Sequence, residues 1–149
     1  MLVSREEIQN LIPQRPPMVM IDCLVDCDEK YAVSMLEIRE DNIFTGKNGF
    51  TPAGMLEAMA QTAAARTGYL LQNSGSEQNK KPPVGVIGSI KNFRLYFEPP
   101  VGSLITMTVE IEHEVLQATV ISGRVETDGR LAAESELQIF LTEERAVEL

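Results

Sequence analysis

The chain has 149 residues, which suits one domain that buries about two thirds of its unfolded surface. Its 13 basic and 22 acidic residues give a formal net charge of −9, which argues against nucleic acid or an anionic membrane as a partner. No apolar run approaches the roughly 20 residues needed to span a bilayer, and Arg5, Glu6 and Glu7 stand where a signal peptide would be apolar. We therefore expect a single cytoplasmic domain over residues 1–149.

The first predicted element is a short helix near the start of the chain. Ser4-Arg5-Glu6-Glu7 has the pattern of a capping box, and Ile8, Leu11 and Ile12 follow as one apolar stripe. Pro13 then ends the helix. We expect this stripe to pack against the rest of the domain.

Two strands are predicted next. Residues 18–25 are nearly all apolar, which is typical of a strand buried on both faces, and residues 31–38 form a second candidate. Cys23 and Cys27 lie four residues apart in the first strand, roughly 13 Å if extended. That separation is too long for a disulfide, so both are expected to be free core thiols.

The strongest predicted element is a helix over residues 53–71. Residues 41–50 form a loop with two glycines, Thr51 offers an N-cap, and Pro52 stands at the first helical position. Residues 58–65 contain no charge and no clear polar face. A helix that is small and apolar all round is expected to be buried all round.

The remainder is strand-like. Extended segments are predicted over residues 83–98, 104–111, 115–126 and 131–141, with a tight turn at Asp128-Gly129. Gly85 and Gly88 are interpreted as positions where the backbone approaches the helix or a ligand. Consecutive long strands are expected to form an antiparallel sheet. A single helix that is buried all round must be covered by the rest of the chain, which a curved sheet can do. The prediction is an α+β hot-dog fold, a curved antiparallel sheet wrapped around one central helix.

The chemically interesting residue is Glu57, at the edge of the uncharged part of this helix. A poorly hydrated carboxylate suits general acid–base work, and Gln61 lies one turn later, where it can orient Glu57. The free amides of Ala53 and Gly54 can hold a thioester oxygen as it gains negative charge. The plainer alternative is that Glu57 is a solvated acid that complements the helix dipole.

Other chemistries have little support. The sequence has no glycine-rich phosphate loop, no serine elbow and no ligand cluster for zinc or iron, so neither a metal nor a cofactor is expected. The single histidine, His113, stands between two glutamates near a predicted turn and is interpreted as a surface residue. Asp22 and Asp26 are interpreted as structural.

Several segments resemble the bacterial 3-hydroxyacyl-[acyl carrier protein] dehydratases over residues 8–142. Residues 12–22 (Ile-Pro-Gln-Arg-Pro-Pro-Met-Val-Met-Ile-Asp) are similar to the family's Leu-Pro-His-Arg-x-Pro opening, and residues 57–61 (Glu-Ala-Met-Ala-Gln) to its catalytic-helix motif. Residues 89–94, 99–102 and 131–134 are similar to later strands and turns. The resemblance implies that Glu57 is catalytic, and we expect the substrate to be bound by Gln61, Gly54, Ala53 and Phe50.

One departure from the family is chemically important. The family pairs its glutamate with a histidine in a Gly-His-Phe-Pro segment before the helix. Here that stretch is Gly49-Phe50-Thr51-Pro52, or Gly46-Lys47-Asn48 with a different gap, and Gln14 replaces the histidine of the opening motif. The resemblance therefore implies a site without its usual base.

Three hypotheses follow. The chain is an active dehydratase or hydratase in which water or Tyr69 replaces histidine, a half-catalytic or non-catalytic subunit that binds an acyl thioester, or an acyl-thioesterase. The family builds each site at a dimer interface, so we expect either a homodimer or a heterodimer with a hot-dog paralogue. The substrate is an acyl thioester of acyl carrier protein or coenzyme A. An acidic carrier would need a basic docking patch, for which the candidates are Lys80, Lys81, Lys91 and Arg94.

Overall fold

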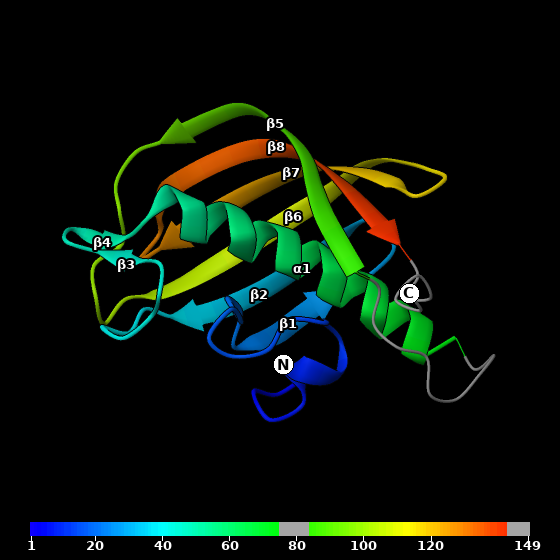
Figure 1. Cartoon of the computed structure of the whole chain (residues 1–149), viewed down its shortest axis with the longest axis horizontal. Helices are drawn as coiled ribbons and strands as arrows, with labels where there is room; N and C mark the ends of the chain where they lie inside the picture. Colours follow the sequence, from blue (N-terminus) through cyan, green and yellow to red (C-terminus); the bar gives the residue numbers. More distant parts are fainter. Residues whose placement is uncertain (75–83, 143–149) are drawn as a thin grey trace, which may run out of the picture.

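A computed structural model describes residues 1–74 and 84–142 of the chain, with the side chains of residues 141 and 142 left out. The elements along these residues are labelled in Figure 1. They are the 3-10 helix η1 (Ile8–Asn10), the strands β1 (Cys23–Cys27), β2 (Tyr31–Glu37), β3 (Thr45–Gly46) and β4 (Gly49–Phe50), the helix α1 (Pro52–Gln72), and the strands β5 (Val84–Leu95), β6 (Leu104–Val115), β7 (Ala118–Thr127) and β8 (Arg130–Thr142).

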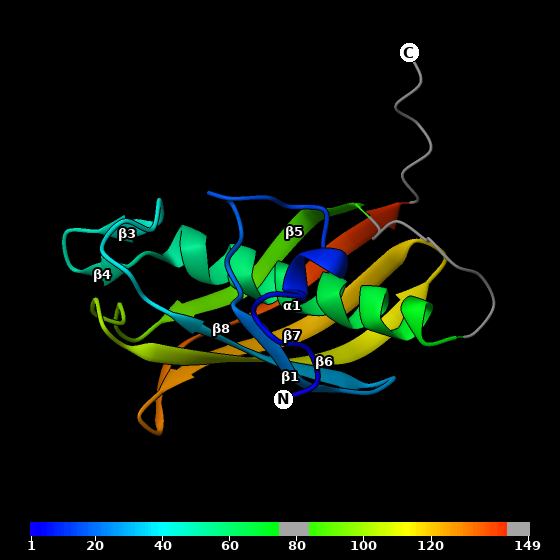
Figure 2. The ribbon, with the colours of Figure 1, turned by 90° about the horizontal axis from the view of Figure 1, so that it is seen from below.

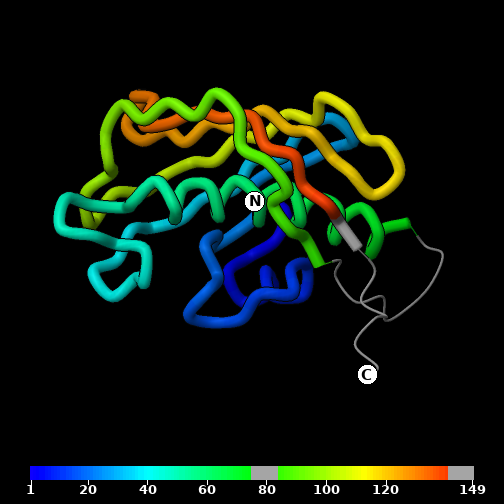
Figure 3. Tube along the Cα trace, turned by 45° about the horizontal axis from the view of Figure 1, so that its top comes forward, coloured from blue at the N-terminus to red at the C-terminus, as the bar shows by residue number. Residues whose placement is uncertain are grey.

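The long strands form one antiparallel sheet in the order β1-β2-β6-β7-β8-β5, so β1 and β5 are its edges. The sheet curves around α1, which lies along its concave face (Figures 1 and 2). The N-terminal segment lies on the other side of the helix, as Figure 3 shows. This is the predicted α+β hot-dog fold, and α1 is enclosed because its alanine-rich surface lets both layers come close.

Helix α1 begins and ends within one residue of the prediction. It is buried along most of its surface, and Gly68 has no room for a side chain because the backbone carbonyl of Leu11 lies against it. One stripe is only partly covered, however, and it comprises Ala53, Leu56, Glu57 and Ala60. Within residues 58–65, for which burial all round was expected, only Ala60 belongs to this stripe and the others are buried. Among the described residues no helix combines the length and apolar character that crossing a bilayer requires.

The first predicted helix is reduced to the three residues of η1. The Ser4 hydroxyl lies 3.4 Å from the Glu7 carboxylate, and no side chain caps the element. The apolar stripe of Ile8, Leu11 and Ile12 is nevertheless buried as predicted. So short a helix has little stability of its own, so burial of the stripe determines the path of this segment.

The strand predicted over residues 18–25 was wrong in its first half, because β1 begins only at Cys23. The predicted loop 41–50 contains the short pair β3–β4. The predicted turn at Asp128-Gly129 is confirmed, with φ values of 51° and 72°. The turn predicted near His113 lies further along the chain, because β6 continues to Val115 and the tight turn follows it, with Leu116 at a φ of 57°.

Two predictions about small residues had different outcomes. Cys23 and Cys27 are both free, and Cys23 is buried. Burial raises the pKa of both thiols. Gly88 does not make room for the helix or a ligand, because the space that its side chain would fill is taken by the ring of Phe140 on the neighbouring strand.

Candidate functional site

Gln61 is the most constrained polar residue of α1. Its side chain is buried, with 1% of the residue exposed, yet it makes three hydrogen bonds. Nε2 donates to Glu57 Oε2 at 2.9 Å and to the Met18 carbonyl at 2.7 Å, while Oε1 accepts the Met20 N–H at 2.7 Å. These bonds fix the amide orientation, because only Nε2 can donate and only Oε1 can accept.

The segment around Met18 and Met20 was not recognised from the sequence as part of the site. Its apolar residues resembled a strand, yet two of its backbone groups bond to a helix side chain. The only sequence signal was the similarity of residues 12–22 to the family's opening motif. The structure therefore links the two most family-like motifs of the chain through one glutamine.

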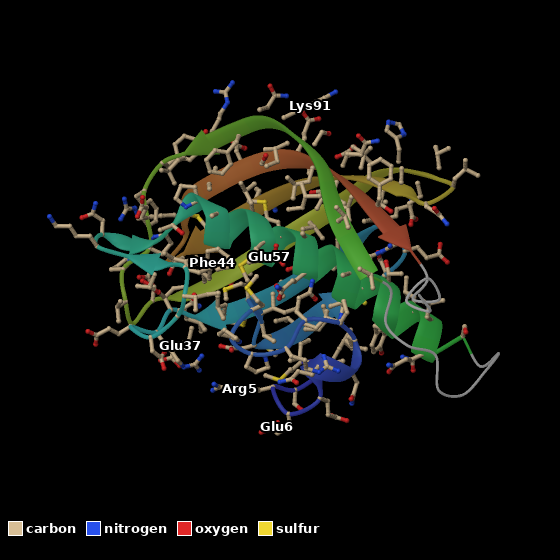
Figure 4. All side chains as sticks on the ribbon, in the orientation of Figure 1. Arg5, Glu6, Glu37, Phe44, Glu57 and Lys91 are labelled. Atoms are coloured by element: carbon tan, nitrogen blue, oxygen red, sulfur yellow. The ribbon has the colours of Figure 1, made fainter. Side chains whose placement is uncertain are left out.

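Glu57 lies on the partly covered stripe of α1, and Figure 4 shows it near the middle of the molecule. Gln61 donates to one of its carboxylate oxygens, and no ion pair among the described residues involves Glu57. Its stripe neighbours Leu56 and Ala60 are apolar. The carboxylate is thus held on one side and open on the other, where it can exchange a proton with a bound substrate.

The start of α1 supplies unbonded amides on the same side of the helix as Glu57. Thr51 precedes Pro52 but donates its hydroxyl to the Phe44 carbonyl at 2.8 Å, so it does not cap the helix. Within residues 1–74 and 84–142, no acceptor is seen for the Ala53 and Gly54 N–H groups. Ala53 lies one turn before Glu57, a rise of about 6 Å along the axis. A thioester oxygen at these amides would place its carbon chain beside the carboxylate.

Phe50 lies in the core beneath the helix start, fully buried. Its ring packs against Gly54, where a side chain on the glycine would come within 2.6 Å of it. Its N–H donates to the Pro99 carbonyl at 2.8 Å. One of the two alignments puts the family's histidine at this position, where an apolar core residue stands here, and the other puts it at Lys47.

No substitute base is brought to Glu57 by the described residues. Tyr69 is twelve residues further along α1, about 18 Å along the axis, so it lies far from Glu57 of the same chain, and its replacement of histidine at a site shared by two chains stays a prediction. His113 is exposed on β6, as predicted. Within the same described ranges, no three His, Cys, Asp or Glu side chains gather into a metal site.

The two aspartates interpreted as structural do make structural contacts. Asp22 accepts the Glu37 N–H at 2.9 Å and lies 3.5 Å from Arg39. Asp26 accepts a hydrogen bond from the Tyr31 hydroxyl, and this bond raises the pKa of Tyr31 to about 12. A further buried charge that the sequence did not reveal is Arg66, which donates to the carbonyls of Asp28 and Glu29.

Comparisons with known proteins identify the family of the chain. The profile of the ApeP-like dehydratases matches residues 6–148. The chain is 31% identical over 140 residues to the 3-hydroxyacyl-[acyl-carrier-protein] dehydratase FabZ of Cereibacter sphaeroides, covering 90% of this chain and 87% of the relative. It is 29% identical over 148 residues to FabZ of Rickettsia bellii, covering 95% and 97%.

Among solved structures, the chain resembles the dehydratase heterocomplex ApeI:P of Xenorhabdus doucetiae, with a TM-score of 0.77 and 14% identity over 92% of this chain and 91% of that one. At this identity the likeness shows the hot-dog fold. The fold, the family profile and the FabZ relatives lead to one conclusion: the chain belongs to the ApeP-like dehydratase family and is a dehydratase-like protein of the FabZ type.

Proposed function

We propose that this chain contributes Glu57 to a 3-hydroxyacyl-thioester dehydratase site that a second, histidine-bearing hot-dog chain completes. The observation that carries the proposal is the state of Glu57, oriented by Gln61 but without a basic partner among the described residues. A dehydration needs both an acid and a base. In a homodimer of this chain, both sites would contain Phe50 and neither would contain the histidine.

The reaction would be an elimination of water. The partner's histidine would take the proton from the carbon next to the thioester, and protonated Glu57 would give its proton to the departing hydroxyl. The C–H electrons become the new double bond as the C–O bond breaks. Amides of Ala53 and Gly54 would stabilise charge on the thioester oxygen, and Gln61 would be a positioning residue for Glu57.

The surface that would receive the partner is the edge of the sheet at β5. Within the sheet formed by the described residues, this strand is an edge and pairs with β8. It exposes apolar side chains at Val86, Ile90 and Leu95. An open apolar edge is a template for pairing with another strand. The related ApeI:P structure is a heterocomplex, which supports a partner of different sequence.

For the substrate we propose a thioester of acyl carrier protein, since the curated relatives act on that carrier. Of the predicted docking patch, Lys80 and Lys81 lie outside the described residues. Lys91 and Arg94 are exposed on β5, but each stands opposite a glutamate of β8, Glu136 and Glu134. Opposed charges weaken this patch, so the partner chain would supply much of the surface that receives an acidic carrier.

The test is a dehydration assay on 3-hydroxyacyl thioesters of several chain lengths. It compares the chain alone with the chain co-purified with a histidine-bearing hot-dog dehydratase, and free thiol is monitored throughout. We expect enoyl product only from the mixed complex. Enoyl product from the chain alone would contradict the half-site proposal, and free thiol without enoyl product would indicate a thioesterase.

The variant Glu57→Gln tests the assignment of the carboxylate. Because an amide cannot give up the proton needed by the leaving hydroxyl, we expect activity of the mixed complex to fall by about 100-fold or more. Assembly, followed by size-exclusion chromatography, should be unchanged. The matched control is Glu37→Gln, an exposed glutamate at the edge of the molecule (Figure 4). Full activity in Glu57→Gln would remove Glu57 from the mechanism.

A further inference from the structure

A cavity of about 350 Å³ lies apart from the helix face that carries Glu57. It opens between the N-terminal segment, the stretch from Pro16 to Asp22, strand β2 and the loop that follows β2. Its walls include Ile8, Ile21 and Leu36, which are buried apolar residues. Cavities that bind small molecules combine such apolar walls with a few polar groups, and this volume is at the lower end of their range of about 300–1,000 Å³.

The cavity and the proposed dehydratase site are on opposite sides of one backbone segment. Val19 lines the cavity, whereas the backbone groups of its neighbours Met18 and Met20 bond to Gln61. Neither Glu57 nor Gln61 lines the cavity. Figure 4 shows Arg5, which does line it, at the edge of the molecule and well apart from Glu57. A ligand here would not be a substrate in reach of Glu57.

Two arginines and two aspartates line the cavity, so their charges cancel overall and a preference for an anion is local to Arg5. Arg39 is already occupied, because it lies 3.5 Å from Asp22 and 3.3 Å from Glu37. Arg5 takes part in no ion pair among the residues that the structure describes. Asp41 is on the rim as well and would repel an anion. The head group of an anionic ligand would therefore lie beside Arg5.

We propose that this cavity binds a small amphipathic anion, with the head group on Arg5 and a short apolar body against Val19 and Ile43, above the buried side chains of Ile8, Ile21 and Leu36. Guanidinium groups recognise carboxylates and phosphates equally well by paired hydrogen bonds. Two sources share this chemistry, a medium-chain fatty carboxylate and the phosphate-bearing phosphopantetheine arm of an acyl carrier. Gln9, beside Arg5 on the cavity wall, offers an additional amide donor to either head group.

Binding is measured on the full chain by titration calorimetry and by two-dimensional NMR, with octanoate, 4′-phosphopantetheine and 1-octanol as probes. We expect at least one anion to bind and to shift the resonances of Leu36 and Ile43, which line the cavity. Octanoate alone would identify a fatty carboxylate, and 4′-phosphopantetheine alone the carrier arm. The proposal is overturned if neither anion binds, if 1-octanol binds equally tightly, or if the shifts fall on Leu56 and Ala60 beside Glu57.

Two variants test the polar and apolar parts separately. Arg5→Gln should weaken binding of the anion about tenfold, the effect of one charge-assisted contact. Ile43→Glu should abolish binding, because it puts a negative charge on the cavity wall. Ile43 is half-exposed, so the charge stays hydrated and the fold should be retained. Lys47→Gln, on the exposed β3–β4 turn outside the cavity, is the control and should bind as tightly as the natural chain. Unchanged affinity in both cavity variants would refute the site.

Discussion

Gln61 shows how one polar side chain serves both the fold and the site. It satisfies backbone groups of Met18 and Met20 and holds one oxygen of Glu57. Buried polar groups are costly when unpaired, so a glutamine in the middle of an alanine-rich helix needs all of these partners. The residue that orients the carboxylate also attaches the N-terminal segment to α1.

Replacing Gln61 with alanine should therefore reduce stability as well as activity. The Met20 N–H would be buried without a partner, whereas the Met18 carbonyl lies in a residue that is 38% exposed and can turn to water. We expect a loss of about 1–3 kcal/mol in the free energy of unfolding, measured by urea denaturation. The control is Gln72→Ala, on the same helix as Gln61. It removes an exposed hydrogen bond from the Gln72 side chain to the Asn10 carbonyl and should cost less than about 0.5 kcal/mol. Equal losses in both variants would show that burial is not the cause.

Tyr31 gives a prediction about pH. Its hydrogen bond to Asp26 raises its pKa from 10.0 to about 12 in the folded state. The stabilisation is fully present below the unfolded pKa near 10 and is lost as pH rises through the folded value near 12. Ultraviolet titration should show that the Tyr31 phenol ionises near pH 12 in the natural chain. In Asp26→Asn the same phenol should ionise at a lower pH. The hydrogen bond to Glu134 also raises the pKa of Tyr96, so one tyrosine titrates late in both chains, and an unchanged number of late-titrating tyrosines in Asp26→Asn would contradict this cause.

Among the elements, the β6–β7 hairpin departs most from local preference. Leu116, at its tip, is 100% exposed and has a φ of 57°, where a side chain collides with its own backbone. The β7–β8 turn uses Asp128 and Gly129 at positive φ, residue types that tolerate this conformation. The two hairpins therefore turn differently: Asp128 and Gly129 both have positive φ in the β7–β8 turn, whereas only Leu116 does in the β6–β7 turn.

The substitution Leu116→Gly should stabilise the chain. It relieves a backbone strain of about 1–2 kcal/mol and removes no buried surface, although glycine loses some backbone entropy on folding. We expect a gain of about 0.5–1 kcal/mol in thermal or urea unfolding. Asp128→Gly, at a similar φ of 51°, should gain less because aspartate already tolerates this region. A loss of stability in Leu116→Gly would mean that the leucine makes a contact worth more than the strain.

At the scale of the whole molecule, the sheet ends differently at its two edges. β1 is covered in part by a backbone bridge from Val3 to Leu24. β5 has no neighbour beyond it in the sheet among the described residues, and its side chains Val86, Ile90 and Leu95 are exposed. An apolar edge of this kind is a place where chains associate.

Ile90→Asp should therefore weaken association without unfolding the subunit. Ile90 is 46% exposed, so a charge there keeps access to water in the monomer but would be buried between paired chains. Sedimentation analysis of the mixed complex should show dissociation, and circular dichroism should show retained structure. Val115→Asp, on the exposed hairpin tip away from this edge, is the control and should leave assembly intact. Dissociation in both variants would argue against β5 as the interface.

The sequence by itself determined the central helix, the antiparallel strands and their wrapping, because periodicity, turn residues and an uncharged helix are local signals. It also marked Glu57 and Gln61, whose spacing of four places both on one helix face. The absence of the family's usual histidine could also be inferred from the sequence, because His113 is its only histidine.

Only the tertiary structure decided the rest. Residues 18–22 have the composition of a strand, but they cross the helix because Gln61 satisfies their backbone, a contact over 41 residues of sequence. Phe50 was expected at the substrate, and its place in the core depends on the close packing of Gly54 above it. The cavity beside Arg5 follows likewise from how distant segments pack, which no local pattern contains.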